Sequence, residues 1–164
     1  MRRAMRRKAQ QLTREQTEAI LKENTVGVLS VNGEDGYPYA VPMNYWYENG
    51  KLWFHCAVEG YKLDCLRRND KVSFCVIGQN TFIPEKFTTH YTSVIAFGRA
   101  RIVTESHKVA DALRAFAKRF CPEPALAESL EKEVEGTRGR VFMLCVEIEH
   151  MTGKAAIELV NSAD

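Results

Sequence analysis

The stretch FHCAVEGYKLDCL contains the imidazole of His55, the ammonium of Lys62 and, between them, Gly60, which has no side chain. The pattern predicts the end of a strand followed by a helix over 59–68. The first turn of a helix carries unpaired N–H groups and a partial positive charge. Gly60 allows a ligand to approach the backbone, and Lys62 adds a full cation. The stretch therefore predicts a phosphate site with donors from 60–63. An ordinary strand–helix junction is the alternative, because glycine and lysine also occur at helix starts that bind nothing.

A second candidate segment, YPYAVPMNYWY, could meet a flat polar ring. Pro38 and Pro42 cannot donate to a β-ladder, so this strand is expected at a sheet edge or with an interruption. The backbone of Met43 and Asn44 would then be free to bind the edge of a ring such as a flavin. The alternative is a bulged edge strand whose aromatic side chains, Trp46 among them, pack on the core.

Composition limits the function classes. The 164 residues, 45% hydrophobic and 27% charged, suit one globular domain with a core, and the net charge of +2 gives no overall drive toward nucleic acid. Five basic residues lie in the opening MRRAMRRK, which lacks the apolar region of a signal peptide. The five cysteines form no CxxC or zinc-spaced cluster. We expect reduced thiols, no metal and a cytoplasmic protein.

The surrounding pattern predicts a mainly β domain with flanking helices. The box TREQ predicts the start of a helix at 13–16, and alternation with turn signals predicts some six strands joined largely by hairpins. Such a set closes more readily into a small barrel than into a parallel sheet. The expected strands are 25–31, 37–47, 51–56, 71–78, 93–103 (with a bulge at Gly98) and 140–150; the expected later helices are 106–120 and 124–135; and 79–91 is expected to be a polar loop.

Four blocks of the chain together resemble a known superfamily: MRRK with the capped helix, TVGVLSVNGEDGYPYAVPMNY, WFHCAVEGYKLDCLRRNDKVSF and YTSVIAFGRARIV. The chain is similar to the pyridoxamine 5′-phosphate oxidase-like, FMN-binding split-barrel superfamily, and within it to the 5-nitroimidazole resistance group. The resemblance implies a Greek-key-like split barrel over 1–164, with a basic arm at 1–12 and a tail at 151–164. It also implies a homodimer with FMN in a groove between the subunits.

The resemblance carries roles to particular positions. Lys62 matches a phosphate contact, His55 and Cys56 match an aromatic–hydroxyl pair, and Ser93 matches a polar side chain from the long central strand. Tyr45, Trp46 or a residue of the 79–92 loop is expected to cover the ring. The expected FMN-binding residues are Val41, Pro42, Met43, Asn44, Tyr45, His55, Cys56, Ala57, Gly60, Tyr61, Lys62, Leu63, Ser93, Thr152 and Lys154.

The resemblance also implies chemistry. Tyr61 and Ala40 stand where pyridoxamine phosphate oxidases carry cations, so pyridoxine chemistry is not expected. His55 resembles a histidine usual in the nitroimidazole-resistance group, which implies a catalytic proton donor in the reduction of a small nitro-aromatic, with NAD(P)H or another donor supplying electrons. Alternatives are an FMN-binding electron carrier or sensor, a haem protein using His55 or His90, and a nucleic-acid binder using the basic arm.

Overall fold

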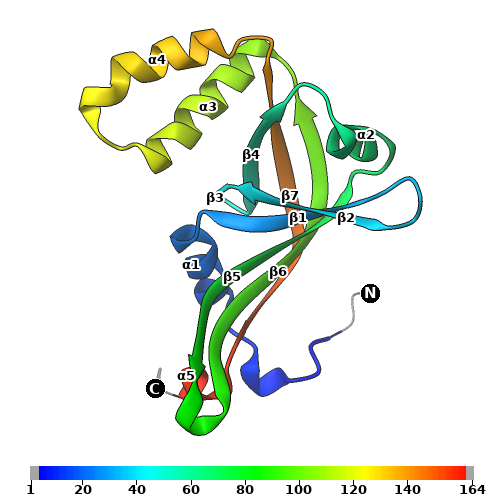
Figure 1. The fold of residues 1–164 in the computed structure, drawn as a ribbon, viewed down its shortest axis with the longest axis vertical. Helices are drawn as coiled ribbons and strands as arrows, with labels where there is room; N and C mark the ends of the chain where they lie inside the picture. The colour runs from blue at the N-terminus through cyan, green and yellow to red at the C-terminus, as the bar shows by residue number, and fades with distance from the viewer. Residues whose placement is uncertain (1–3, 162–164) are drawn as a thin grey trace.

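One antiparallel sheet of seven strands, in the order β2-β1-β5-β6-β7-β4-β3, organises the computed structural model, which describes residues 4–161 (Figure 1). The strands are β1 (Val26–Asn32), β2 (Pro38–Asn44), β3 (Trp46–Glu48), β4 (Lys51–Ala57), β5 (Lys71–Ile83), β6 (Thr88–Val103) and β7 (Val141–Ala155). The helices are α1 (Arg14–Glu23), α2 (Tyr61–Arg68), α3 (Ser106–Phe120), α4 (Ala127–Gly136) and α5 (Ile157–Asn161), with short 3₁₀ turns at Lys8–Gln10, Pro84–Lys86 and Pro124–Leu126.

The two edges of the sheet meet at a single residue. β2 forms one edge and β3 the other, yet only Tyr45 separates them in the chain. The sheet must therefore curl until its edges lie next to each other, although no ladder closes it within the described residues. The Tyr45 N–H donates to the Thr25 carbonyl at 2.9 Å, and its buried hydroxyl donates to the Leu21 carbonyl at 2.9 Å. The expected split barrel is confirmed, with an open seam at this residue.

The core lies inside the curl. Tyr45, Phe54 and Phe74 pack together, with the ring centroids of Tyr45 and Phe54 4.9 Å and 5.1 Å from that of Phe74. Helix α1 begins at the predicted capping box, where Thr13 accepts from the Gln16 N–H and the Gln16 side chain accepts from the Thr13 N–H. A second apolar cluster lies on the outer face of β4 and β7, beneath α3. Figure 1 shows α3 and α4 as a helical hairpin at one end of the molecule.

Three expectations about element boundaries were wrong. The segment 79–91 is not a loop, because β5 and β6 continue as a two-stranded arm that turns at Pro84–Lys86 (Figure 1). Such a ribbon faces solvent on both sides, so it shows no apolar alternation to reveal it. Residues 151–155 are the end of β7 rather than a tail. The sheet has one strand more than the six expected, because 37–47 divides at Tyr45.

The predicted irregularity at Gly98 is confirmed. The pairing of β6 with β7 shifts register between Phe97 and Gly98, and a side chain at Gly98 would collide with the Glu147 carbonyl. A bulge of this kind bends the strand that carries it and increases the local twist of the sheet.

Candidate functional site

The predicted junction of strand, glycine and helix lies at the end of β4, and we call the space above Gly60, with the N–H groups of Tyr61 and Lys62 and the Lys62 ammonium, the cradle. Gly60 caps α2 with φ 133° and ψ 159°, a conformation open only to glycine, and no atom beyond its two chain neighbours lies within 4 Å of where its Cβ would be. The Leu63 and Asp64 N–H groups bond back to the Gly60 carbonyl. Among residues 4–161 no acceptor takes the N–H groups of Tyr61 and Lys62. These two donors and the open space above Gly60 suit a phosphate.

Lys62 joins α2 to the two strands that face it. Its Nζ lies 3.6 Å from the Met43 sulfur on β2. Its charge also reaches β4, where it helps to lower the pKa of His55 and partly offsets the effect of burial on Cys56. The structure therefore places Lys62 in contact with Met43 and lets its charge act on His55 and Cys56 of the neighbouring strand β4.

His55 lies on the outward face of β4, beside α3. Its ring forms a T-shaped pair with the buried Phe116 ring, with centroids 5.1 Å apart and planes at 79°. Partial burial first, and the field of Lys62 second, hold the pKa of His55 below its ordinary value. The neutral imidazole, which can donate one hydrogen bond and accept another, is thus favoured near neutral pH. A helix at 106–120 could be predicted from the sequence, but nothing in the local pattern indicated that it would lie beside His55.

The expected ring-binding strand is the edge strand β2, as its prolines predicted. Val41 and Met43 face inward, whereas Pro42 and Asn44 are exposed. The Tyr45 side chain is 1% exposed, so the expectation that it covers a ring does not hold, and only its backbone can meet a ligand. Leu63 is equally buried, and its N–H is bonded to the Gly60 carbonyl, so neither its side chain nor its N–H is open to a ligand, contrary to the expectation. Trp46 stacks on Trp53 under α3, with centroids 6.3 Å apart.

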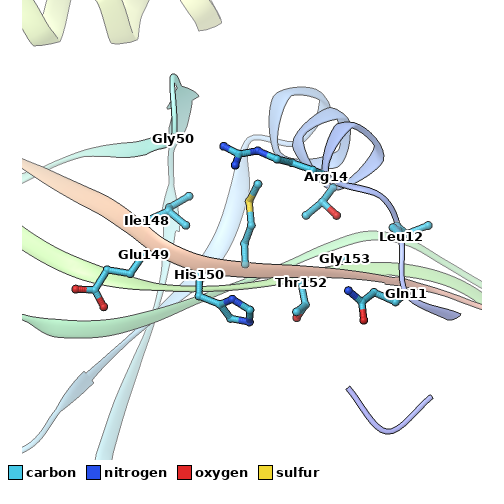
Figure 2. A pocket seen from close by; sticks show the side chains of 11 residues that line it. Gln11, Leu12, Arg14, Gly50, Ile148, Glu149, His150, Thr152 and Gly153 are labelled. Carbon is cyan, nitrogen blue, oxygen red and sulfur yellow. The ribbon is translucent and has the colours of Figure 1, made fainter. Parts of the chain in front are cut away.

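The remaining predicted residues, Ser93, Thr152 and Lys154, form a second group on the outer face of β6 and β7. Ser93 pairs with Lys154, and Thr152 pairs with Ile95, two residues further along each strand and therefore on the same face. They line an open groove of about 520 Å³ together with Met5, Ile95, Phe97 and His150. Figure 2 shows a neighbouring pocket of about 290 Å³, in which His150, Thr152 and Gln11 point to one side of β7 and Arg14 lies on the other. Sequence reasoning missed Met5 and Phe97, which have no chemical signature.

The second group and Pro42, the neighbour of Met43 in the chain, lie at opposite sides of one continuous sheet face. Pro42, Val28, Cys75, Ile95 and Thr152 form a row across five adjacent strands. Four interstrand spacings separate the ends of this row, roughly 19 Å along the curved sheet. The face between them carries exposed Val26, Ile77 and Ile95, which are 53%, 65% and 43% exposed.

Other site types find no support in the described part of the chain. Residues 4–161 contain no group of three or more His, Cys, Asp or Glu side chains able to hold a metal. All five cysteines are free thiols. None of the described helices has both the length and the apolar character needed to cross a membrane.

An antiparallel sheet that curls until its edges meet at one residue, with a glycine–lysine cradle after its fourth strand, defines the split-barrel class. The family model for pyridoxamine 5′-phosphate oxidase matches residues 13–155, and the chain therefore belongs to that family. No curated protein matches the chain.

Solved structures share this fold at low sequence identity. A candidate 5-nitroimidazole antibiotic resistance protein from Bacteroides thetaiotaomicron has 21% identity and a TM-score of 0.73, over 88% of this chain and 86% of that one. An FAD-binding protein from Mesorhizobium loti has 22% identity and a TM-score of 0.62, over 89% and 96%. An FAD- and haem-binding protein from Mycobacterium smegmatis has 18% identity and a TM-score of 0.69, over 94% and 80%.

Proposed function

We propose that the protein is a flavin-dependent oxidoreductase that reduces a small nitro-aromatic or related acceptor. The observation that carries the proposal is the cradle, in which two N–H donors, open space above Gly60 and the Lys62 cation meet beside His55. These residues are proposed to bind the riboflavin 5′-phosphate unit of the cofactor. It is the whole of FMN, the expected cofactor, and also part of FAD. The neighbours with flavin-binding or nitroimidazole-resistance names support the same class.

Each residue group has a distinct task in this proposal. The N–H groups of Tyr61 and Lys62 and the Lys62 ammonium hold the phosphate. The backbone of Met43, Asn44 and Tyr45 orients the ring at the sheet edge. A bound flavin supplies the hydride or electron transfer. His55 donates a hydrogen bond or a proton to the acceptor, and because its pKa is lowered, the imidazolium form becomes abundant only at a lower pH than for an ordinary histidine.

A second copy of the chain completes the site in this proposal. Ser93, Thr152 and Lys154 lie too far across the sheet from Pro42 to contact the same ring within one chain. A homodimer formed through the exposed apolar face would bring this groove of one copy to the cradle of the other. Covering Val26, Ile77 and Ile95 would also remove apolar surface from water.

The test is flavin uptake followed by turnover. Protein dialysed against flavin is expected to be yellow and to oxidise NAD(P)H when a 5-nitroimidazole is added without oxygen. His55→Phe preserves a ring against Phe116, so it should keep its flavin and lose nitro reduction. His107→Phe, at the exposed start of α3, is the matched control and should keep both.

Other outcomes of this test separate the competing functions. Flavin uptake without any turnover in the native protein would indicate an electron carrier or sensor. A Soret band in the same spectrum would indicate haem. The Nε2 atom of His90 is buried without a hydrogen-bond partner among the described residues, and His90 is therefore the first histidine to replace in that case.

A further inference from the structure

An aromatic wall flanks the cradle on the side of β2. Tyr61 is the first residue of α2, next to Gly60, and its ring meets the Tyr39 ring of β2 with centroids 5.1 Å apart and planes at 70°. Each of these two tyrosines is 40% exposed. A T-shaped pair leaves a ring face bare, so a flat group that reached this wall could stack there.

The Tyr61 ring is held in place by the turn between β1 and β2. Its hydroxyl accepts from the Glu34 N–H at 2.9 Å. Gly33 leaves room for that hydroxyl, since a Cβ at this position would lie 3.0 Å from it. The Glu34 carboxylate in turn pairs with Arg68 at the other end of α2. With its hydroxyl occupied, Tyr61 presents a fixed ring to the cradle.

The charges around the cradle suit a phosphodiester better than a phosphate monoester. Lys62 is the cation beside Met43 and His55, whereas Arg67 and Arg68 of the same helix are paired with Asp64 and Glu34. A monoester carries about −1.5 to −2 charge at pH 7. Each phosphate of a dinucleotide carries a single charge. One ammonium and one helix N-terminus therefore match the inner phosphate of a dinucleotide more closely than the terminal phosphate of FMN.

We propose that Tyr39 and Tyr61 form a subsite for the adenine ring of a flavin dinucleotide, so that the cofactor of this protein is FAD. The proposal rests on the proposed function, because it requires the riboflavin 5′-phosphate unit to lie at Gly60 and Lys62. From that position the second phosphate and the adenosine extend toward the exposed wall. Base–aromatic stacking accepts any base, so the wall supplies affinity and the flavin supplies the chemistry.

The experiment compares FAD with FMN by equilibrium dialysis against the full-length apoprotein. The native protein is expected to bind FAD about tenfold or more tightly than FMN, the scale of one base–aromatic stack. Tyr39→Leu should remove most of this difference and leave FMN affinity within about twofold, and Tyr61→Leu should weaken the binding of FAD more than that of FMN. Tyr61→Phe keeps the ring and loses only the bond to Glu34, so it should retain the preference for FAD.

The alternative explanation is that Tyr61 only ties the turn to α2. It predicts that Tyr61→Phe and Tyr61→Leu behave alike and change both affinities equally, and this result would overturn the proposal. Equal affinity of the native protein for FAD and FMN would also overturn it, while leaving the flavin function intact. Binding of neither flavin would refute the proposed function and this inference together. Circular dichroism of each variant identifies any loss of affinity that comes from misfolding, and the Tyr39 variant then gives the independent measurement.

Discussion

Replacing Lys62 by alanine tests the cradle most directly. The ammonium lies on a half-buried side chain beside Met43, with its charge felt at His55 and Cys56. A hydrogen bond to a charged group contributes about 1.5–3 kcal/mol. Solvent reaches this side chain, so the lower half of that range is expected. The substitution should therefore weaken flavin binding by a factor of about 10 to 40.

The assay is equilibrium dialysis with FMN, whose phosphate has no neighbouring adenosine to supply other contacts. Lys132→Ala, on exposed α4, is the matched control and should bind FMN like the native protein. Lys62→Ala offers a second and independent readout in the His55 ring protons measured by NMR. Because the Lys62 charge helps to lower the pKa of His55, removing it should raise that pKa.

The two readouts separate geometry from function. If the pKa of His55 rises and FMN affinity stays unchanged, Lys62 lies where the structure places it but does not bind phosphate. The cradle assignment would then be wrong. If both change as expected, the same ammonium serves the phosphate and the imidazole.

Four further results are expected. Gly60→Val forces a side chain into a glycine-only conformation over the cradle and should abolish flavin uptake in dialysis. The control Gly139→Ala, also at positive φ, should lower the free energy of unfolding in urea and leave flavin uptake unchanged. The free energy of unfolding should rise with pH through about 6.5, because folding lowers the pKa of His55 and the unfolded chain therefore binds more protons. Urea titrations of His55→Phe should lack the part of this rise that comes from His55. The proposed homodimer predicts that Ile95→Asp gives a monomer without flavin by light scattering and absorbance, while Leu126→Asp, exposed outside the sheet, still forms the dimer. Tyr45→Phe leaves the buried Leu21 carbonyl without its donor and should cost about 1–3 kcal/mol in urea unfolding, an expectation that an unchanged midpoint would contradict.

Much of the fold could be predicted because local signals agreed with the final packing. The capping box at Thr13 depends only on residues three apart, and the apolar stripe of α3 has the period of a helix. The prolines of β2 indicated an edge strand because a missing N–H is tolerated there. The arm of β5 and β6 was missed because a ribbon exposed on both faces has no hydrophobic period.

Only part of the candidate site could be predicted from the sequence. Gly60 and Lys62 lie within one turn of each other, so their proximity follows from the chain itself. The contact of His55 with Phe116 spans 61 residues and depends on how α3 crosses β4, which no local pattern specifies. The separation of the Ser93 group from the cradle likewise emerges only from the strand order.

Tyr45 links the stability of the fold to the geometry of the site. It joins the two edges of the sheet, anchors the end of α1 through Leu21, and follows directly on the backbone expected to orient the ring. Movement at this residue would shift β2 relative to β4, and hence Met43 relative to His55. Lys62 contacts Met43, and its charge lowers the pKa of His55, so the movement would disturb both relations.

A flavin held at both the cradle and β2 should therefore resist opening of the seam. Ligand that binds only the folded state raises the free energy of unfolding, so saturating flavin should recover part of the stability lost in Tyr45→Phe. A phosphate analogue that contacts only the cradle should recover less, and equal recovery by both ligands would show that the ring does not bind across the seam.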